Sequence, residues 1–309
     1  MTQVFAHALL AATAVFAGAT QSRALPVSPP PTDSLTVVVA GASPQRVSDQ
    51  FKFTEGPAVD KRGNVFFTDQ PNDKIYKWAT DGTLSVFMDK TGRANGLYFD
   101  KKGNLLACAD EKNELWSIDP KTKKVTVLLT ELDGKKLNGP NDLWVAPNGG
   151  IYFTDPYYQR DYWERKKPDI EGQKVYFLSR GAKKPVVVDD GLQQPNGIVG
   201  TPDGKHLFVA DIRARKTYKY AINPDGSLGE RQFFVSQGSD GMTLDASGNL
   251  YLTGQGVTVY DPTGKKLGNI PVPSRWVGNV AFGGKDRRTL FITASESVYT
   301  LPMTVKGVE

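Results

Sequence analysis

The feature of this sequence that most limits its fold is a strand–turn–strand unit that occurs six times along the chain. Each unit has an apolar segment, a turn that usually contains glycine, and a second apolar segment, which is the pattern of a β-hairpin. The turns follow one another at intervals of about 40 to 55 residues, the period of a four-stranded propeller blade. The six units are TEGPAVDKRGNVFFTD, ANGLYFDKKGNLLACAD, PNDLWVAPNGGIYFTD, PNGIVGTPDGKHLFVAD, SDGMTLDASGNLYLTG and GNVAFGGKDRRTLFITA.

Two further short apolar segments lie between consecutive units, such as KIYKWAT and LSVFMD after the first unit. Each repeat therefore has about four strands, as a propeller blade does. No long helical pattern interrupts the repeats, and we predict an all-β fold, a six-bladed β-propeller. Because an open ring would leave strand edges exposed, we expect LTVVVA, near Leu35, and the final SVYTLP to share one blade and close the ring.

The N-terminal region predicts an export signal followed by a linker. Residues 4–19 are apolar, and Ala17-Gly18-Ala19 resembles a cleavage site, although no Lys or Arg precedes the apolar stretch. The predicted organisation is a signal peptide over residues 1–24, a Pro-rich linker over 25–34 and a propeller hydrolase domain over 35–309. The expected location is the periplasm or the medium, or the cytoplasm if the first segment is not a signal. No membrane contact is expected after signal removal.

The charge pattern argues against a nucleic-acid-binding protein, and the cysteine count argues against a disulfide-stabilised one. The net charge is +5, but basic and acidic residues are interspersed and no RNA-reading motif is present, so we expect no nucleic-acid partner. Cys108 is the single cysteine, which excludes an intramolecular disulfide. It lies in the apolar segment LLACAD, where we expect a buried small residue rather than a nucleophile. The sequence indicates no oligomeric state.

Each of the six units begins with an oxygen-bearing side chain. Counting back by one fixed offset from each turn position reaches Glu, Asp or Asn every time. The first strand of each propeller blade lines the central channel, so we expect these side chains to converge at one mouth. Turn initiation by Asn or Asp before Gly is the alternative explanation, but it explains the glutamate less well. The ring consists of Glu55, Asn95, Asn141, Asn196, Asp240 and Asn279.

The chemistry of this ring predicts a divalent cation site. Carboxylate and amide oxygens suit Ca²⁺, which accepts irregular coordination, and Mg²⁺, Mn²⁺ or Zn²⁺ are alternatives. The chain has only two histidines, which excludes a zinc site of the His-rich kind. Glu55 and Asp240 would nearly neutralise a divalent cation, and the site would retain room for a substrate oxygen.

Metal-assisted hydrolysis is the reaction that these residues favour. A Ser-His-Asp triad is disfavoured because His206 lies in the turn PDGKHL, at the opposite mouth from the ring. A cation in the ring would polarise an ester or lactone carbonyl and stabilise the oxyanion. Asp240 is the candidate catalytic base that takes a proton from the attacking water, and its roles as ligand and base are not separable in the sequence.

Several motifs resemble the gluconolactonase/regucalcin (SMP-30/gluconolactonase/LRE-like) family from about Phe53 onward: TEGPAVD, NGPNDLWV followed by IYFTDPYY, QQPNGI and SDGMTLDASGNLYL. The resemblance implies a six-bladed propeller that binds one divalent cation, usually calcium, and hydrolyses sugar lactones such as gluconolactone. It implies metal ligands at Glu55, Asn196 and Asp240, with Asp240 also the base. Asn141 matches the asparagine that faces metal-bound water or substrate, so we include it among the metal candidates.

The substrate contacts are less strongly indicated. We expect Asn141, Asn95 and Tyr157 to contact the substrate. The animal branch of the family has a basic substrate-binding residue two positions before the PND asparagine, where this chain has Gly139. This difference leaves the sugar specificity open.

One connection on the ring side is much longer than the others. It follows Asp155 and reads PYYQRDYWERKKPDIEGQ, with four aromatic and four basic residues. Long loops on rigid scaffolds often form binding walls, so we expect the loop to cover part of the ring and select the substrate. A solvated insertion or a protein-contact loop is the alternative. Trp276 is expected to stack on a sugar or to be buried.

The leading functional hypothesis is a calcium-dependent lactonase with a small-molecule lactone as substrate. One alternative is hydrolysis of other esters or organophosphates at the same ion. Another is a non-enzymatic ligand-binding propeller with a structural Ca²⁺. A strictosidine-synthase-like propeller is disfavoured by the acidic ring. Propellers host many functions, so the fold does not decide among these hypotheses.

Overall fold

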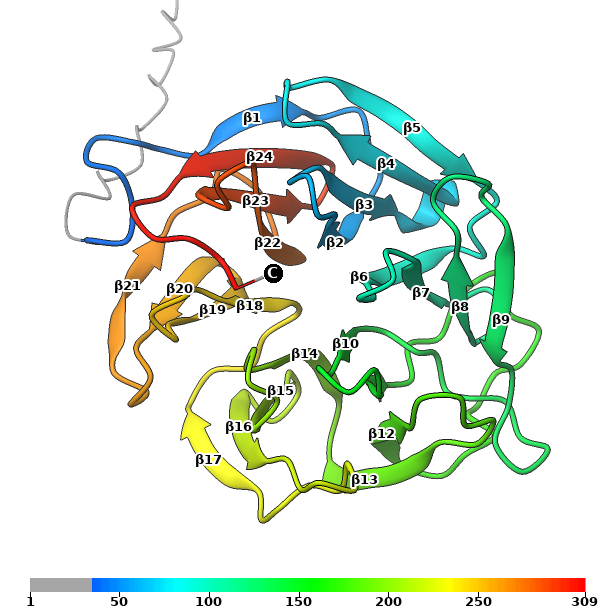
Figure 1. The fold of residues 1–309 in the computed structure, drawn as a ribbon. Helices are drawn as coiled ribbons and strands as arrows, with labels where there is room; N and C mark the ends of the chain where they lie inside the picture. Colours follow the sequence, from blue (N-terminus) through cyan, green and yellow to red (C-terminus); the bar gives the residue numbers. More distant parts are fainter. Residues whose placement is uncertain (1–34, 309) are drawn as a thin grey trace, which may run out of the picture.

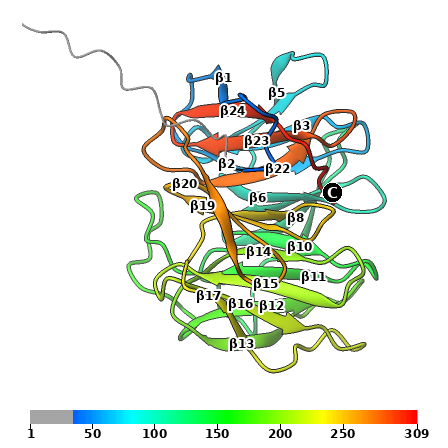
Figure 2. The ribbon, with the colours of Figure 1, turned by 90° about the vertical axis from the view of Figure 1, so that its left-hand side faces the viewer.

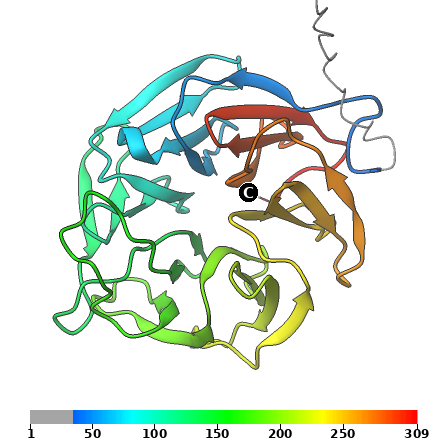
Figure 3. The same cartoon turned by 180° about the vertical axis from the view of Figure 1, so that it is seen from behind.

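The computed structural model describes residues 35–308. The predicted signal peptide and linker lie outside these residues. Within them, six four-stranded antiparallel sheets surround a central axis like blades (Figures 1 and 3). The helical content of this part of the chain is one short 3₁₀ turn, Gln70–Asn72, and none of its helices is long and apolar enough to cross a membrane. The prediction of a six-bladed β-propeller is confirmed.

The blades are numbered from the first to the last in the chain, and each begins with the strand nearest the axis. Blades 1 to 3 are β2 Thr54–Val59, β3 Val65–Asp69, β4 Lys74–Trp78 and β5 Leu84–Asp89; β6 Ala94–Phe99, β7 Leu105–Ala109, β8 Glu114–Ile118 and β9 Val125–Leu129; β10 Leu143–Val145, β11 Ile151–Asp155, β12 Gln173–Leu178 and β13 Val186–Leu192. Blades 4 to 6 are β14 Pro195–Gly200, β15 His206–Asp211, β16 Lys216–Ala221 and β17 Gln232–Val235; β18 Met242–Leu244, β19 Leu250–Gly254, β20 Gly256–Tyr260 and β21 Lys266–Ile270; β22 Asn279–Gly283, β23 Thr289–Ala294, β24 Ser297–Pro302 and β1 Gln45–Ser48.

The ring is closed by the pairing of β1 with β24, which lie side by side in Figure 2. The prediction is right for SVYTLP but wrong for LTVVVA, which forms only an isolated bridge from Val38 to Met303. Leu35, Val37 and Val38 are instead buried against the core of blades 5 and 6. The polar segment Gln45–Ser48, which is half exposed, suits the outer edge of a blade better than an apolar segment does.

Burial follows the order of strands within a blade. Every residue of β2, β3 and β7 is buried, whereas the rim strands β5 and β9 keep exposed side chains. Aromatic residues fill the space between blades, as where Phe66 packs edge-to-face on Phe87 and Phe99 with ring centroids 4.9 and 5.1 Å apart. Each fully buried side chain of this kind contributes roughly 1.5–3 kcal/mol of stability.

The six first strands approach one another closely because glycine often follows the ring residue. A Cβ atom on Gly96 would lie 2.6 Å from the backbone oxygen of Asn141, and one on Gly241 would lie 1.9 Å from Cγ of Asn279. No larger residue fits at these positions without displacing the next blade. The Asn-Gly and Asp-Gly pairs therefore serve the packing around the axis.

Buried threonines of the second strands join each odd-numbered blade to the next one. Thr68 donates a hydrogen bond to the backbone oxygen of Asn95 (3.0 Å), Thr154 to that of Asn196 (2.8 Å) and Thr253 to that of Gly278 (2.9 Å). Each bond fixes the backbone at or next to a ring residue. In blade 2 the equivalent position is occupied by Cys108, which is fully buried, as predicted.

We predict that Thr68→Val lowers the free energy of unfolding by about 1–2 kcal/mol, because the shape of the side chain is kept while a buried hydrogen bond is lost. Denaturant titration measures the change. Thr126→Val is the matched control, since Thr126 is exposed on β9, and its effect should stay within about 0.5 kcal/mol. Equal effects of the two substitutions would contradict the role of the threonine hydroxyl.

Candidate active site

The structure places all six ring residues where the first strands begin. Four are within β2, β6, β14 and β22, and Asn141 and Asp240 lie two positions before the first residues of β10 and β18. Five of the six side chains are buried, and Asp240 is half-buried. Because the first strands surround the axis (Figure 3), the polar side chains gather at the mouth where these strands start, as the repeat predicted.

Glu55 and Asp240 form the electrostatic centre of this ring. Burial raises the pKa of Glu55 well above its ordinary value, and the neighbouring Asp240 raises it further. Burial likewise raises the pKa of Asp240. Two carboxyl groups that share a poorly solvated site disfavour each other's ionisation. A divalent cation between them would remove this repulsion.

Asp240 is held in place by two neighbours. The indole Nε1 of Trp276 donates a hydrogen bond to its Oδ2 at 2.6 Å. The side chain of Asn196 also hydrogen-bonds to it and lowers the pKa of its carboxyl group, as Trp276 does. Trp276 thus orients an acidic ring residue. The sequence had suggested only that Trp276 stacks on a sugar or is buried.

Asp142 is a buried acidic residue that the sequence reasoning did not select. It occupies the position that glycine takes after most ring residues, and its Oδ1 accepts a hydrogen bond from the backbone of Leu143 (2.9 Å). Its Oδ2 accepts a hydrogen bond from Nδ2 of Asn279 at 3.4 Å. The two residues belong to blades 3 and 6, which lie on opposite sides of the axis, so this contact crosses the channel. The sequence signal that could have identified Asp142 is the motif PND, which has Asp where most other units have Gly after the ring residue.

The donor chemistry of the ring fits a hard cation. No group of three or more His, Cys, Asp or Glu residues within the described part of the chain is arranged to hold a metal ion. The ring instead combines the electrostatically interacting carboxyl groups of Glu55 and Asp240 with amide oxygens, and Ca²⁺ accepts both kinds of ligand. The residues present therefore suit calcium better than zinc or another metal that prefers nitrogen and sulfur.

The long loop after β11 reaches the ring through Tyr158. Its hydroxyl oxygen accepts a hydrogen bond from Nδ2 of Asn196 at 2.9 Å. Tyr157, the expected substrate contact, donates its hydroxyl hydrogen to Gln159 (2.6 Å), and its ring lies 5.4 Å from Cζ of Arg165. These side-chain contacts of Tyr157 are with other residues of the loop. Sequence alone does not indicate which of two adjacent tyrosines faces the ring.

Aspartates at the ends of the second strands hold the segments that lead into the ring. Asp155 accepts hydrogen bonds from the backbone nitrogens of Asn138 (2.9 Å) and Gly139 (2.8 Å), just before Asn141. Asp211 accepts two bonds of the same kind just before Asn196, from residues 193 and 194. These aspartates therefore fix the start of the first strand of their own blade.

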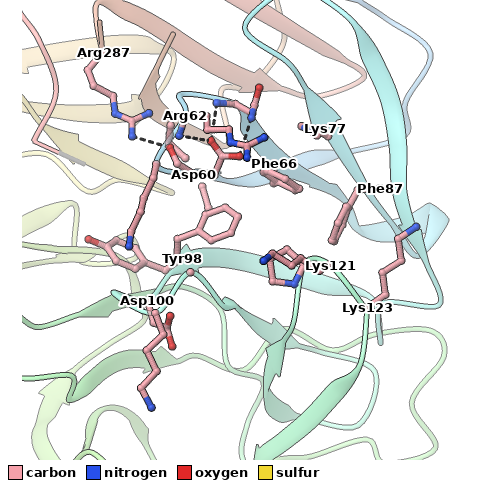
Figure 4. Close-up of a pocket in the computed structure, with 18 residues that line it drawn as sticks. Asp60, Arg62, Phe66, Lys77, Phe87, Tyr98, Asp100, Lys121, Lys123 and Arg287 are labelled. Atoms are coloured by element: carbon pink, nitrogen blue, oxygen red, sulfur yellow. Dashed lines mark hydrogen bonds between the residues drawn. The ribbon is translucent and has the colours of Figure 1, made fainter. Parts of the chain in front are cut away.

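A cavity of about 670 Å³ lies between blades 1 and 2, away from the ring (Figure 4). Phe66 and Phe87 line it beside Lys77 and Lys121, and it adjoins the turns that follow β2 and β6. Those turns are at the other end of the first strands from the ring. None of the six ring residues lines this cavity, so it is not the site that the repeat defines.

Fold and site together define a six-bladed propeller that carries a ring of acidic and amide side chains where its first strands begin. Residues 53–296 match the model of the SMP-30/Gluconolactonase/LRE-like region. The match covers well over half of the chain, and the protein belongs to this family.

Named relatives cover most of the chain. It is 29% identical over 284 residues to the gluconolactonase of Zymomonas mobilis, a match that covers 82% of this chain and 79% of the relative. It is 34% identical over 265 residues to the pentonolactonase XacC of Haloferax volcanii, covering 81% and 84%. The solved structure of the gluconolactonase XC5397 from Xanthomonas campestris superposes with a TM-score of 0.80 at 29% identity, covering 87% of this chain and 91% of that one.

We predict that Trp276→Phe raises the pKa of Asp240 in metal-free protein, because the lost indole hydrogen bond favours the ionised carboxylate. Carboxyl ¹³C NMR during a pH titration measures the change. Trp116→Phe is the control, since the indole of Trp116 donates to Glu114 instead, and it should leave Asp240 unaffected. A lowered or unchanged pKa in Trp276→Phe would contradict the assignment.

Proposed function

We propose that this protein is a metal-dependent lactonase that hydrolyses a sugar lactone of the gluconolactone kind. Like its relatives, it is a hydrolase of lactone ester bonds. The observation that carries the finer proposal is the pair of carboxyl groups of Glu55 and Asp240 within a ring of amides: burial raises the pKa of both, and Asp240 raises the pKa of Glu55 further. Such a pair is typical of a cation site rather than of a structural core.

Glu55, Asn196 and Asp240 would hold the cation, with Asn141 beside them. A bound divalent cation, of which Ca²⁺ fits these oxygen donors best, supplies the positive charge that polarises the lactone carbonyl and stabilises the oxyanion. With two carboxylates at the centre of the ring, the charge of such an ion is nearly balanced. An approaching neutral lactone therefore meets no large net charge.

In the reaction, Asp240 acts as the base. Trp276 bonds to its Oδ2, so the carboxylate is oriented before a substrate arrives. As the oxygen of a water molecule attacks the carbonyl carbon, the carboxylate accepts one proton from that water. The bond between the carbonyl carbon and the ring oxygen then breaks. The departing oxygen takes up the proton that Asp240 had accepted, which restores the carboxylate, and an open hydroxy acid is the product.

The amides of the ring position the substrate. Asn141 and Asn95 are buried at the channel mouth, where their side chains can donate hydrogen bonds to substrate oxygens. Tyr158, bonded to Asn196, forms part of the wall above them. Water exclusion by this wall strengthens the polar contacts inside it.

We predict that chelation abolishes the hydrolysis of D-glucono-1,5-lactone and that added Ca²⁺ restores it. Metal content is measured alongside the rate for a panel of simple lactones, other esters and an organophosphate. Full activity in protein that is verified to be metal-free would contradict the metal dependence. Turnover of the other esters alone would favour a different hydrolase, and calcium binding without any turnover would favour a ligand-binding propeller.

We predict that Asp240→Asn lowers kcat by about 10²- to 10⁴-fold, as expected for loss of a general base. Calcium binding, measured by calorimetry, separates the loss of the base from the loss of the metal. Asp81→Asn, at an exposed turn, is the control and should leave the rate unchanged. A variant at Asp240 that keeps both the metal and the normal rate would disprove the assignment.

A further inference from the structure

The structure contains a buried acidic residue that the proposed reaction does not use. Asp110 directly follows β7 and is 2% exposed. Its Oδ2 accepts hydrogen bonds from Nε of Arg160 (2.7 Å), the hydroxyl of Tyr162 (2.6 Å) and Nε2 of Gln70 (3.1 Å). One carboxylate oxygen of blade 2 thereby fixes two side chains of the long loop and one residue of blade 1.

This anchor determines how Arg160 presents its guanidinium group. The side chain is 25% exposed, and among the described residues only Asp110 accepts a hydrogen bond from it, at Nε. The two terminal nitrogens are therefore available to donate hydrogen bonds elsewhere. An arginine that is already fixed loses little conformational entropy when it binds a ligand.

The guanidinium group lies beside the ring. Its Cζ is 5.7 Å from the ring centroid of Tyr158, whose hydroxyl is bonded to the ring residue Asn196. The guanidinium group carries its positive charge next to the carboxylate of Asp110. Because Asp110 balances that charge, Arg160 acts as a fixed set of donors rather than as a trap for anions.

Gly139, which lies next to Asp110, has no room for a basic side chain. A Cβ atom on Gly139 would lie 2.8 Å from Oδ1 of Asp110 and 3.1 Å from the indole of Trp163. The φ angle of Gly139 is +156°, which side chains rarely adopt. Asp110 and Trp163 therefore occupy the space beside Gly139, and the basic group bound to Asp110 there is Arg160.

We propose that Arg160 is a specificity-determining residue whose terminal nitrogens bind hydroxyl groups of the lactone. The enzyme then prefers polyhydroxylated lactones to lactones without hydroxyl groups, because an unsubstituted lactone leaves these donors unpaired in a desolvated site. This inference rests on the proposed lactonase function.

The test compares two substrates with the same six-membered ring, D-glucono-1,5-lactone and δ-valerolactone, which has no hydroxyl groups. Arg160→Met keeps the length of the side chain and removes every donor. We expect it to lower kcat/KM for gluconolactone by about 10- to 100-fold, mainly through KM. The value for δ-valerolactone should stay within about twofold, and Arg160→Lys should recover part of the loss.

Arg165→Met is the matched control in the same loop. Arg165 bonds to the backbone oxygens of Leu137 and Asn138 and lies 4.3 Å from the ring of Trp163, so it holds the loop in place. This variant should affect both lactones alike. If Arg160→Met also lowers both rates equally, or lowers neither, the proposal is overturned.

A binding measurement separates this inference from the proposed function. Calorimetry compares gluconolactam with δ-valerolactam, two analogues that the reaction cannot open. Tighter binding of gluconolactam by the wild type, and its loss in Arg160→Met, would support the role of Arg160 even in a protein that hydrolyses neither lactone. Equal binding by the wild type and Arg160→Met would overturn it, whatever the activity.

Discussion

The site depends on the close approach of the six first strands around the axis. Glycine after the ring residue permits this approach, because a Cβ atom on Gly96 or Gly241 would overlap atoms of the next blade. The same crowding removes water from Glu55 and raises its pKa. Packing and chemistry are thus linked, because the close approach of the first strands gathers polar side chains from different blades into one poorly solvated ring.

Contacts between blades maintain this arrangement. Threonines of the second strands bond to the backbone at or beside ring residues, and the aspartates that end those strands hold the segments just before them. The threonine bonds extend from blades 1, 3 and 5 to the next blade, whereas the aspartates of blades 3 and 4 hold segments of their own blade. The loop after β11 is longer than the corresponding connections of the other blades, and it brings Tyr158 and Arg160 beside the ring.

The periodic features could be predicted from the sequence, whereas the non-periodic features could not. A fixed offset from each turn identified Glu55 and Asp240 as neighbours 185 positions apart, because equivalent positions of a propeller meet at the axis. The direction of Tyr158 and the anchor of Arg160 depend on contacts between the loop and Asp110, for which no period exists. The prediction of the closing strand was wrong because LTVVVA has the apolar pattern of a strand, whereas its apolar side chains are buried against the core of blades 5 and 6.

The closure of the ring also has a consequence for the time at which the site forms. Gly278 packs against the side chain of Glu55, and β1 pairs with β24, the last strand of the chain. During synthesis, Glu55 therefore cannot join Asn279, the last ring residue, until almost the whole chain has been made. Pairing between such distant segments is intrinsically slow. The nascent protein therefore lacks a complete ring, and the six side chains come together only after the two ends of the propeller have met.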